Sequence, residues 1–352
     1  MEKTPRLSHK DLSLSKDEFM KKFMDHYYDP HFRPLDLQIK EIAEVAWSNY
    51  ENSRKAPLTK KAGEDFQDPH YDLSQEWLWA REKIREAQER YIDSNSPRRV
   101  LLISGSNRND QTCPGEISKS SRLVAHAKAT LEKNNIEVKI LDLSLVTSEY
   151  GKTIHPCKGC VSTAMPLCHW PCSCYPNHSL GQIHDWMNEI YPMWVEAHGI
   201  FIVTPVYWLQ VPSSLKLMID RLVCADGGNP DPTSTQGKKA ALAKMLEENW
   251  PYPKHLQGRI YSLFVHGDAE GVDHVKDLLA DWLEAMELKP AQPLSALARY
   301  VDYYGKYSES HAALDKDLAV FKEIENLSIA LAYSLKTEKD LVPPKLIDPR
   351  PK

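Results

Sequence analysis

The sequence contains no long apolar run. None of its apolar segments approaches the ~20 residues that a membrane-spanning helix needs, and its first 20 residues are charged and lack the apolar centre of a signal peptide. A strong charge of one sign is also absent, because 44 Lys and Arg stand beside 49 Asp and Glu, which gives a formal net charge of -5. These absences argue against a membrane protein, an exported protein and a dedicated nucleic-acid binder. We therefore expect a cytoplasmic protein with no membrane or nucleic-acid partner.

The cysteines do not form the even set that is typical of a secreted disulfide framework. There are seven, and five of them lie between residues 157 and 174. An odd, clustered set in a chain of 352 residues indicates metal or redox chemistry rather than structural disulfides. Cys224 stands alone on an apolar helical segment and is interpreted as a core residue. The full set is Cys113, Cys157, Cys160, Cys168, Cys172, Cys174 and Cys224.

The chain divides into two predicted parts. Residues 1–96 form a helical N-terminal extension, with helices that begin near Ser15, Leu35 and Asp72. Residues 97–340 form a larger α/β domain, and the 42% apolar content supports a substantial core. The extension has two interpretations: a dimerisation arm or lid over a neighbouring site, or extra helices packed on their own domain. We favour local packing, because extensions more often pack on their own domain than swap.

From Arg99 onward, predicted strands alternate with predicted helices. This alternation predicts a doubly wound parallel sheet with helices on both faces and a ligand site at the carboxyl ends of the strands. Pro290 and Pro293 weaken the last strand. The strands are expected at 99–104, 137–141, 199–204, 259–265 and 288–294, and the helices at 120–133, 184–197, 213–223, 272–286 and 308–335.

The first strand ends in a loop suited to an anion. The apolar run Val100–Ile103 gives way to Ser104–Arg108, which supplies backbone amides, hydroxyls and a guanidinium. Ser118 and Ser120 stand at the start of the next helix, where free amides favour negative charge. These are the groups that bind a phosphate monoester, and packing alone does not explain them.

Two further loops follow predicted strands. Thr204–Ser213 contains Tyr207 and Trp208, which offer flat apolar surfaces to a planar cofactor, although aromatic residues at strand ends are often core. His266–Gly271 contains glycines that permit a close backbone approach. Each loop alone is a weak signal, but the fold brings the three strand ends together. Lys216, Asp220 and Arg221 are interpreted as a helix-surface or subunit-contact set.

These loops resemble those of a known family. Gly105–Arg108, Ser118–Ser120, Ala197–Trp208 and Leu215–Arg221 are similar to the phosphate and flavin loops of flavodoxin-like NAD(P)H-dependent FMN reductases, a family that includes iron-sulfur flavoproteins. The resemblance covers about residues 99–299. It implies a flavodoxin-like five-stranded parallel sheet and non-covalently bound FMN. The insertion Asn109–Ile117 and the long stretch 226–255 depart from the family pattern.

The resemblance also assigns site residues by position. The phosphate ligands would be Ser106, Arg108, Ser118 and Ser120, and the contacts to the ring or ribityl chain would be Pro205, Val206, Tyr207 and Trp208. The other side of the site would be closed by His266, Gly267 and Asp268. No catalytic residue is assigned, because the flavin carries the chemistry and the protein orients it.

The cysteine cluster has four interpretations. Cluster-bearing family members carry closely spaced cysteines in this part of the chain, which implies a 4Fe-4S cluster on Cys157, Cys160, Cys168 and either Cys172 or Cys174. The third cysteine follows Cys160 after seven intervening residues, however, and three histidines nearby add competing ligands. A structural zinc site, a dithiol redox pair and plain buried thiols therefore stay open.

The expected function is an FMN-dependent oxidoreductase. Electrons would pass from NAD(P)H through FMN to a quinone, a free flavin, a metal ion or a protein, and we expect a homo-oligomer. The alternatives are an electron-transfer flavoprotein without substrate turnover of its own and a flavin-binding sensor. The sequence lacks Gly-x-Gly-x-x-Gly with a downstream acidic residue, so it does not distinguish NADH from NADPH.

Overall fold

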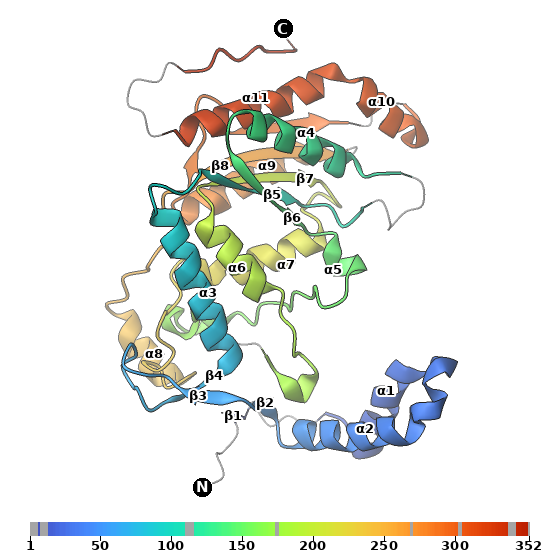
Figure 1. The fold of residues 1–352 in the computed structure, drawn as a ribbon, viewed down its shortest axis with the longest axis vertical. Helices are drawn as coiled ribbons and strands as arrows, with labels where there is room; N and C mark the ends of the chain where they lie inside the picture. The colour runs from blue at the N-terminus through green and yellow to red at the C-terminus, as the bar shows by residue number, and fades with distance from the viewer. Residues whose placement is uncertain are drawn as a thin grey trace.

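A computed structural model describes residues 6–7, 13–109, 116–172, 176–267, 270–301, 305–336 and 343–350. Its centre is a parallel sheet in the order β10-β8-β7-β5-β6 (Figure 1). A two-residue strand, β9, lies beside β8. Because β5 lies between β6 and β7, the strand order reverses at β5, and ligands bind at such a switch point in open α/β sheets. The strands are β5 (Arg99–Ser104), β6 (Glu137–Asp142), β7 (Gly199–Pro205), β8 (Ile260–Gly267), β9 (Lys289–Pro290) and β10 (Ala296–Tyr300).

Helices cover both faces of the sheet, which confirms the predicted flavodoxin-like doubly wound α/β class. On one face, Leu101 and Ile103 of β5 pack with α6, α7 and α9. On the other face, Val100 and Leu102 pack with α4 and α11. Every residue of β5 is buried, as the unbroken apolar run predicts for a central parallel strand. The helices of this domain are α4 (Lys119–Lys133), α5 (Leu145–Ser148), α6 (Met187–Glu196), α7 (Ser213–Arg221), α8 (Ala240–Glu247), α9 (Val272–Ala285), α10 (Ser310–Lys316) and α11 (Leu318–Ser334).

Two expected elements differ from the prediction. The fifth long strand is Ala296–Tyr300, which pairs with β8, and not 288–294. Pro290 and Pro293 have no amide hydrogen to donate to a ladder, so only the two residues of β9 pair before the chain resumes as β10. The helix expected over 308–335 is divided at Asp317, whose carboxylate caps α11 by accepting from Val320 N at 3.1 Å.

The third N-terminal helix, α3 (Gln75–Ile92), is part of the main body. It packs along α6, and its Ile84 and Ala87 join the core of the sheet. Arg90 Nε on α3 lies 2.9 Å from a carboxylate oxygen of Glu196 on α6. His198 donates from Nε2 to Tyr91 O and accepts from Arg99 N, which ties the end of α3 to β5.

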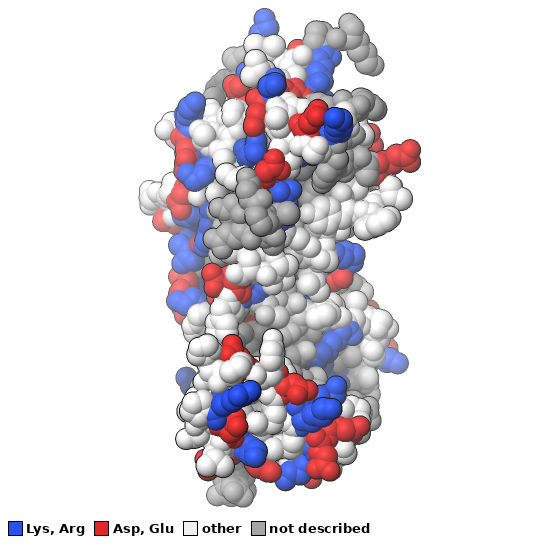
Figure 2. Space-filling model, turned by 90° about the vertical axis from the view of Figure 1, so that its right-hand side faces the viewer, with Lys and Arg blue, Asp and Glu red and all other residues white. Residues whose placement is uncertain are grey.

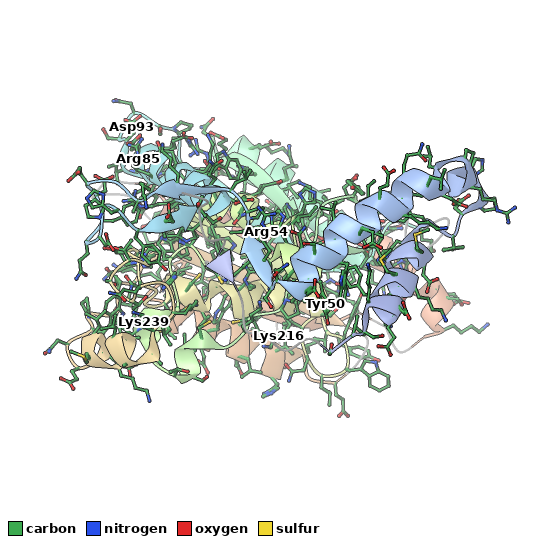
Figure 3. All side chains as sticks on the ribbon, turned by 90° about the horizontal axis from the view of Figure 1, so that it is seen from below. Tyr50, Arg54, Arg85, Asp93, Lys216 and Lys239 are labelled. Carbon is green, nitrogen blue, oxygen red and sulfur yellow. The ribbon has the colours of Figure 1, made fainter. Side chains whose placement is uncertain are left out.

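The first two helices, α1 (Lys16–Met24) and α2 (Asp36–Glu51), form a pair that projects from the body (Figures 1 and 3). Tyr50 of α2 holds the pair together, because its hydroxyl accepts from the amides of Ser13 and Leu14. Three short strands connect the pair to α3: β2 (Arg54–Ala56), β3 (Thr59–Lys61) and β4 (Asp72–Ser74). β3 pairs with β4, and β2 pairs with β1 (Arg6–Leu7), which precedes α1. We call α1 and α2 together the N-terminal arm.

The surface has a mixed charge. Figure 2 shows acidic and basic residues interspersed on one face of the molecule. Within the described ranges, none of the helices combines the length and the apolar content needed to cross a bilayer.

Candidate functional site

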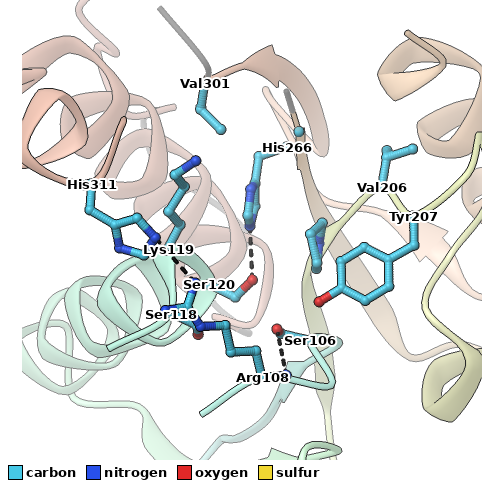
Figure 4. A pocket seen from close by; sticks show the side chains of 12 residues that line it. Ser106, Arg108, Ser118, Lys119, Ser120, Val206, Tyr207, His266, Val301 and His311 are labelled. Atoms are coloured by element: carbon cyan, nitrogen blue, oxygen red, sulfur yellow. Dashed lines mark hydrogen bonds between the residues drawn. The ribbon is translucent and has the colours of Figure 1, made fainter. Parts of the chain in front are cut away.

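The carboxyl ends of β5, β7 and β8 and the start of α4 surround a cavity of about 180 Å³ (Figure 4). Three loops that are far apart in the sequence therefore meet at the switch point, as the strand order requires. The cavity brings together nine of the eleven predicted cofactor-binding residues, and adds Lys119, Val301 and His311. Its lining residues are Ser106, Arg108, Ser118, Lys119, Ser120, Pro205, Val206, Tyr207, His266, Gly267, Val301 and His311.

One side of this cavity is rich in hydrogen-bond donors. Ser106 Oγ accepts from Arg108 N at 3.0 Å, which shapes the turn after β5. Arg108 Nη1 donates to His311 Nε2 across 3.4 Å. Arg108 Nε and His311 Nδ1 are buried and have no hydrogen-bond partner among the described residues. Because buried donors are normally satisfied, these two atoms point to an acceptor that the described part of the chain does not supply.

The start of α4 completes this donor-rich side. Ser118 is the N-cap, and its Oγ accepts from Ser121 N at 3.1 Å. The remaining first-turn amides and the helix dipole favour an anion at this end. Ser120 Oγ lies 2.9 Å from His266 Nε2 at the floor of the cavity. Burial, with a smaller contribution from the charge of Lys119, lowers the pKa of His266 to about 3, so a neutral imidazole orients Ser120.

Gly105 allows the turn after β5 to pass directly against β7. A Cβ atom at this position would lie 2.6 Å from Thr204 Oγ1 and 2.7 Å from Thr204 Cβ. Thr204 is fully buried and Leu215 blocks the other side at 3.0 Å, so the neighbours cannot move aside cheaply. Glycine at 105 is therefore required by this close packing of the first loop against the second.

One predicted contact, Trp208, is not brought to the cavity. Trp208 is 96% exposed and does not line it, because Trp208 and Leu209 adopt the left-handed backbone region with φ of 48° and 62°. They form a tight turn closed by hydrogen bonds between Tyr207 and Gln210 in both directions. Asp268 lies outside the described residues.

Of the three residues that the prediction missed, Lys119 had a readable signal. It stands between Ser118 and Ser120 at the helix start. His311 had no such signal. It lies on α10, 203 positions after Arg108 in the chain, and only the fold brings it to the cavity. Burial and the nearby charges of Lys119, Arg108 and Arg122 lower the pKa of His311, whereas Glu116 opposes this shift.

Residues 98–298, more than half of the chain, match a family described as NADPH-dependent FMN reductase. The chain belongs to this family. It is an NAD(P)H-dependent FMN reductase-like oxidoreductase, as the sequence predicted. No curated protein matches it.

Several solved structures are similar to the reductase. One is RosB with the bound intermediate 8-demethyl-8-formylriboflavin-5'-phosphate, at 16% identity and a TM-score of 0.45 over 68% of this chain and 79% of that chain. A second is the apo form of the NADH:FMN oxidoreductase EMOB, at 15% identity and a TM-score of 0.38 over 69% and 92%. A third is the azoreductase AzrA, at 13% identity and a TM-score of 0.39 over 65% and 98%.

A second, smaller cavity gathers thiols from two parts of the reductase. It is lined by Cys157, Cys160, Cys168, Cys172 and Cys224, together with Lys238 and Arg221. We call it the thiol cavity. Cys224 is buried, as predicted, but it is not isolated, since it lines this cavity with Cys168 and its Sγ donates to Arg221 O at 3.2 Å. Cys174 and Cys113 lie outside the described residues.

The described thiols do not fit the predicted 4Fe-4S cluster. The space between them is about 10 Å³, which is about the room that one water needs. Among the described residues, no three or more His, Cys, Asp or Glu side chains are arranged to hold a metal ion.

The predicted position of Arg221 on the helix surface is wrong. It was interpreted as a surface or subunit-contact residue, but it is buried, with Nη2 2.5 Å from Asp185 Oδ2 and Nη1 donating to His155 O. Burial of a guanidinium requires such a partner. Lys216 and Asp220 form the exposed ion pair that their helical spacing predicts.

Proposed function

We propose that the cavity at the switch point holds FMN by its phosphate and that the reductase passes electrons from NAD(P)H to an acceptor there. The observation that supports this most directly is the pair of buried donors, Arg108 Nε and His311 Nδ1, which have no partner among the described residues. Both residues line the cavity together with the start of α4. A phosphate monoester carries about two negative charges and three acceptor oxygens, and so matches these donors.

The size of the cavity favours the phosphate end of the molecule. Its volume of about 180 Å³ is below the ~300–1,000 Å³ of pockets that enclose a whole small ligand. Arg108, Lys119 and the first turn of α4 would hold the phosphate, and Ser106 would fix the turn that carries Arg108. Pro205, Val206 and Tyr207 would form the wall against the ribityl chain or the ring.

When bound, FMN supplies the two-electron chemistry between a nicotinamide and an acceptor. The residues of the chain bind and orient it, and we assign no acid or base to the reaction. Neutral His266 contributes indirectly, because it holds Ser120 at 2.9 Å and adds no charge to the cavity. The acceptor that we propose is a quinone, a free flavin, a metal ion or a protein.

A steady-state assay tests this proposal. The FMN-loaded protein is mixed with NADPH or NADH and with a quinone, free flavin or ferric complex, and nicotinamide oxidation is followed by absorbance. We expect turnover with at least one small acceptor. If none is reduced but a partner protein is, the molecule is an electron carrier. If FMN does not bind at all, the proposal is wrong.

We also propose a homo-oligomer, supported by the N-terminal arm. Ile42 and Val45 of α2 and its N-cap residue Leu35 are 55%, 64% and 46% exposed. Ile39 and Ala43 lie on the adjoining side of the helix and are already buried. Exposed apolar residues on a projecting helix are typical of an interaction site.

A further inference from the structure

The partly exposed members of the thiol cavity are Cys157, Cys160 and Cys172, and the first two are joined by a short turn. Cys157 also lines an apolar groove of about 460 Å³ on the outer side, beside Trp282 and Met286. A small molecule in that groove can therefore reach a sulfur of the thiol cavity. Cys160 is partly exposed but does not line this groove, and Cys168 and Cys224 are buried and do not line it either.

A glycine turn joins Cys157 and Cys160. Gly159 adopts the left-handed region with φ of 62° and ψ of 34°, which side-chain-bearing residues adopt at a cost. Its amide donates to Cys157 Sγ at 3.3 Å, and the short helix η3 (Cys160–Ser162) starts at the next residue. The turn therefore places both sulfurs of Cys157-Lys158-Gly159-Cys160 on the same cavity.

Lys238 makes Cys160 the nucleophile of the pair. Its Nζ lies 3.1 Å from Cys160 Sγ and is held there by donating to Leu167 O at 2.6 Å. An ammonium donor at a sulfur favours the thiolate, which is the reactive form of cysteine. Cys168 differs, because its interaction with Cys224 and its burial raise the pKa of its thiol well above the usual range.

We propose that Cys157 and Cys160 form a reversible dithiol–disulfide couple that reduces small organic disulfides. In the first step, the Cys160 thiolate attacks one sulfur of the substrate, the substrate S–S bond breaks, and one thiol leaves after taking up a proton. In the second step, Cys157 loses its proton and attacks Cys160 Sγ, which releases the second thiol. Two cysteine thiols become one disulfide, and the substrate gains two electrons and two protons. This activity does not use the FMN cavity, so it stands or fails independently of the proposed function.

The test uses the full-length protein with oxidised glutathione as the substrate. After incubation, free thiols are alkylated and the peptides are mapped by mass spectrometry. We expect a Cys157–Cys160 disulfide in the unchanged protein and a glutathione adduct on Cys160 in Cys157→Ser. A disulfide that joins any other pair, or an adduct absent from Cys160, overturns the proposal. So does iron or zinc bound at one equivalent or more to the cysteines of the purified protein.

Matched lysine variants test the role of Lys238. The alkylation rate of Cys160 at about pH 6.5 is expected to fall about tenfold or more in Lys238→Met, because few ordinary thiols are ionised at that pH. Lys238→Arg keeps a cation and should restore most of the rate. Lys239→Met is the control, because Lys239 bonds Gln236 instead. An unchanged rate in Lys238→Met at every pH, with the fold intact by circular dichroism, contradicts the assignment.

Discussion

Arg108 is the residue whose loss should affect FMN binding most. It lines the cavity and carries a buried Nε without a partner among the described residues. A hydrogen bond to a charged group contributes about 1.5–3 kcal/mol, so Arg108→Gln should raise the Kd for FMN roughly 10- to 150-fold. Titration of apoprotein by flavin fluorescence measures this. Arg85→Gln, on the exposed side of α3 (Figure 3), is the control and should bind normally.

Because His311 lines the proposed phosphate site and can take up a proton, we expect the affinity for FMN to depend on pH. In the free protein its pKa is lowered by burial and by nearby cations, against the pull of Glu116 at 3.5 Å. A phosphate in the cavity would favour the protonated ring, so the pKa should be higher in the complex. Affinity should then rise as the pH falls through the pKa of the ring in the complex, because binding takes up a proton at pH values between the pKa of the free ring and that of the complex. A flat profile in the unchanged protein, or a slope retained in His311→Gln, argues against this role.

Site residues that a local sequence pattern marks could be predicted. Site residues that a distant part of the chain brings to the cavity could not. Ser106, Arg108 and Ser120 follow from a strand-to-helix turn that the sequence displays directly. His311 arrives from another helix, which no local pattern records. Trp208 was predicted as a contact because of its type, but the left-handed turn directs it outward.

At the scale of elements, α3 and α2 should respond differently to the same substitution. Ile84 of α3 is buried in the main core, whereas Ile42 of α2 is 55% exposed. Ile84→Ala should lower the free energy of unfolding by about 2–5 kcal/mol. Ile42→Ala should change it by less than about 0.5 kcal/mol in a monomer. Urea denaturation compares the two, and equal effects would contradict the packing described for α3.

The Ile42 variant also tests the oligomer. If the exposed face of α2 joins two copies, Ile42→Ala should weaken the oligomer while Ile84→Ala leaves its contacts in place. Analytical ultracentrifugation over a range of concentrations measures the dissociation. An unchanged subunit equilibrium in Ile42→Ala would remove the N-terminal arm from the interface.

Helices and strands with a clear apolar periodicity were predicted to within a few residues. The two elements whose predicted bounds were wrong have physical reasons. The strand at Ala296–Tyr300 was misplaced because it is short and follows a proline-interrupted segment, so its apolar signal merged with β9. The split between α10 and α11 depends on a side-chain cap at Asp317, which continuous helical periodicity hides. The orientation of the N-terminal arm depends on tertiary contacts that the sequence pattern does not contain.

At the scale of the whole molecule, buried histidines set the acid limit of stability. Burial lowers the pKa of His198 to about 4 and that of His266 to about 3. Both are neutral when folded but take up protons near pH 6.5 when unfolded, so the unfolded state gains protons first. The free energy of unfolding should fall by up to about 1.4 kcal/mol per pH unit for each histidine as pH drops from about 6.5 to about 4.

Urea titrations of the apoprotein between about pH 7.5 and 4.5 test this acid limit. His198→Gln should flatten the fall in stability between about pH 6.5 and 4, because glutamine takes up no proton in either state. Stability that is constant over this range in the unchanged protein would show that these rings do not have to stay neutral in the fold.

The central claim is that the reductase recognises FMN by its phosphate, and riboflavin tests it most directly because it lacks only that group. Equilibrium titration of the apoprotein with each ligand at the same ionic strength gives both values of Kd. With several charge-assisted donors at the cavity, FMN should bind at least about 100-fold more tightly than riboflavin. Equal affinity for the two ligands would contradict the account.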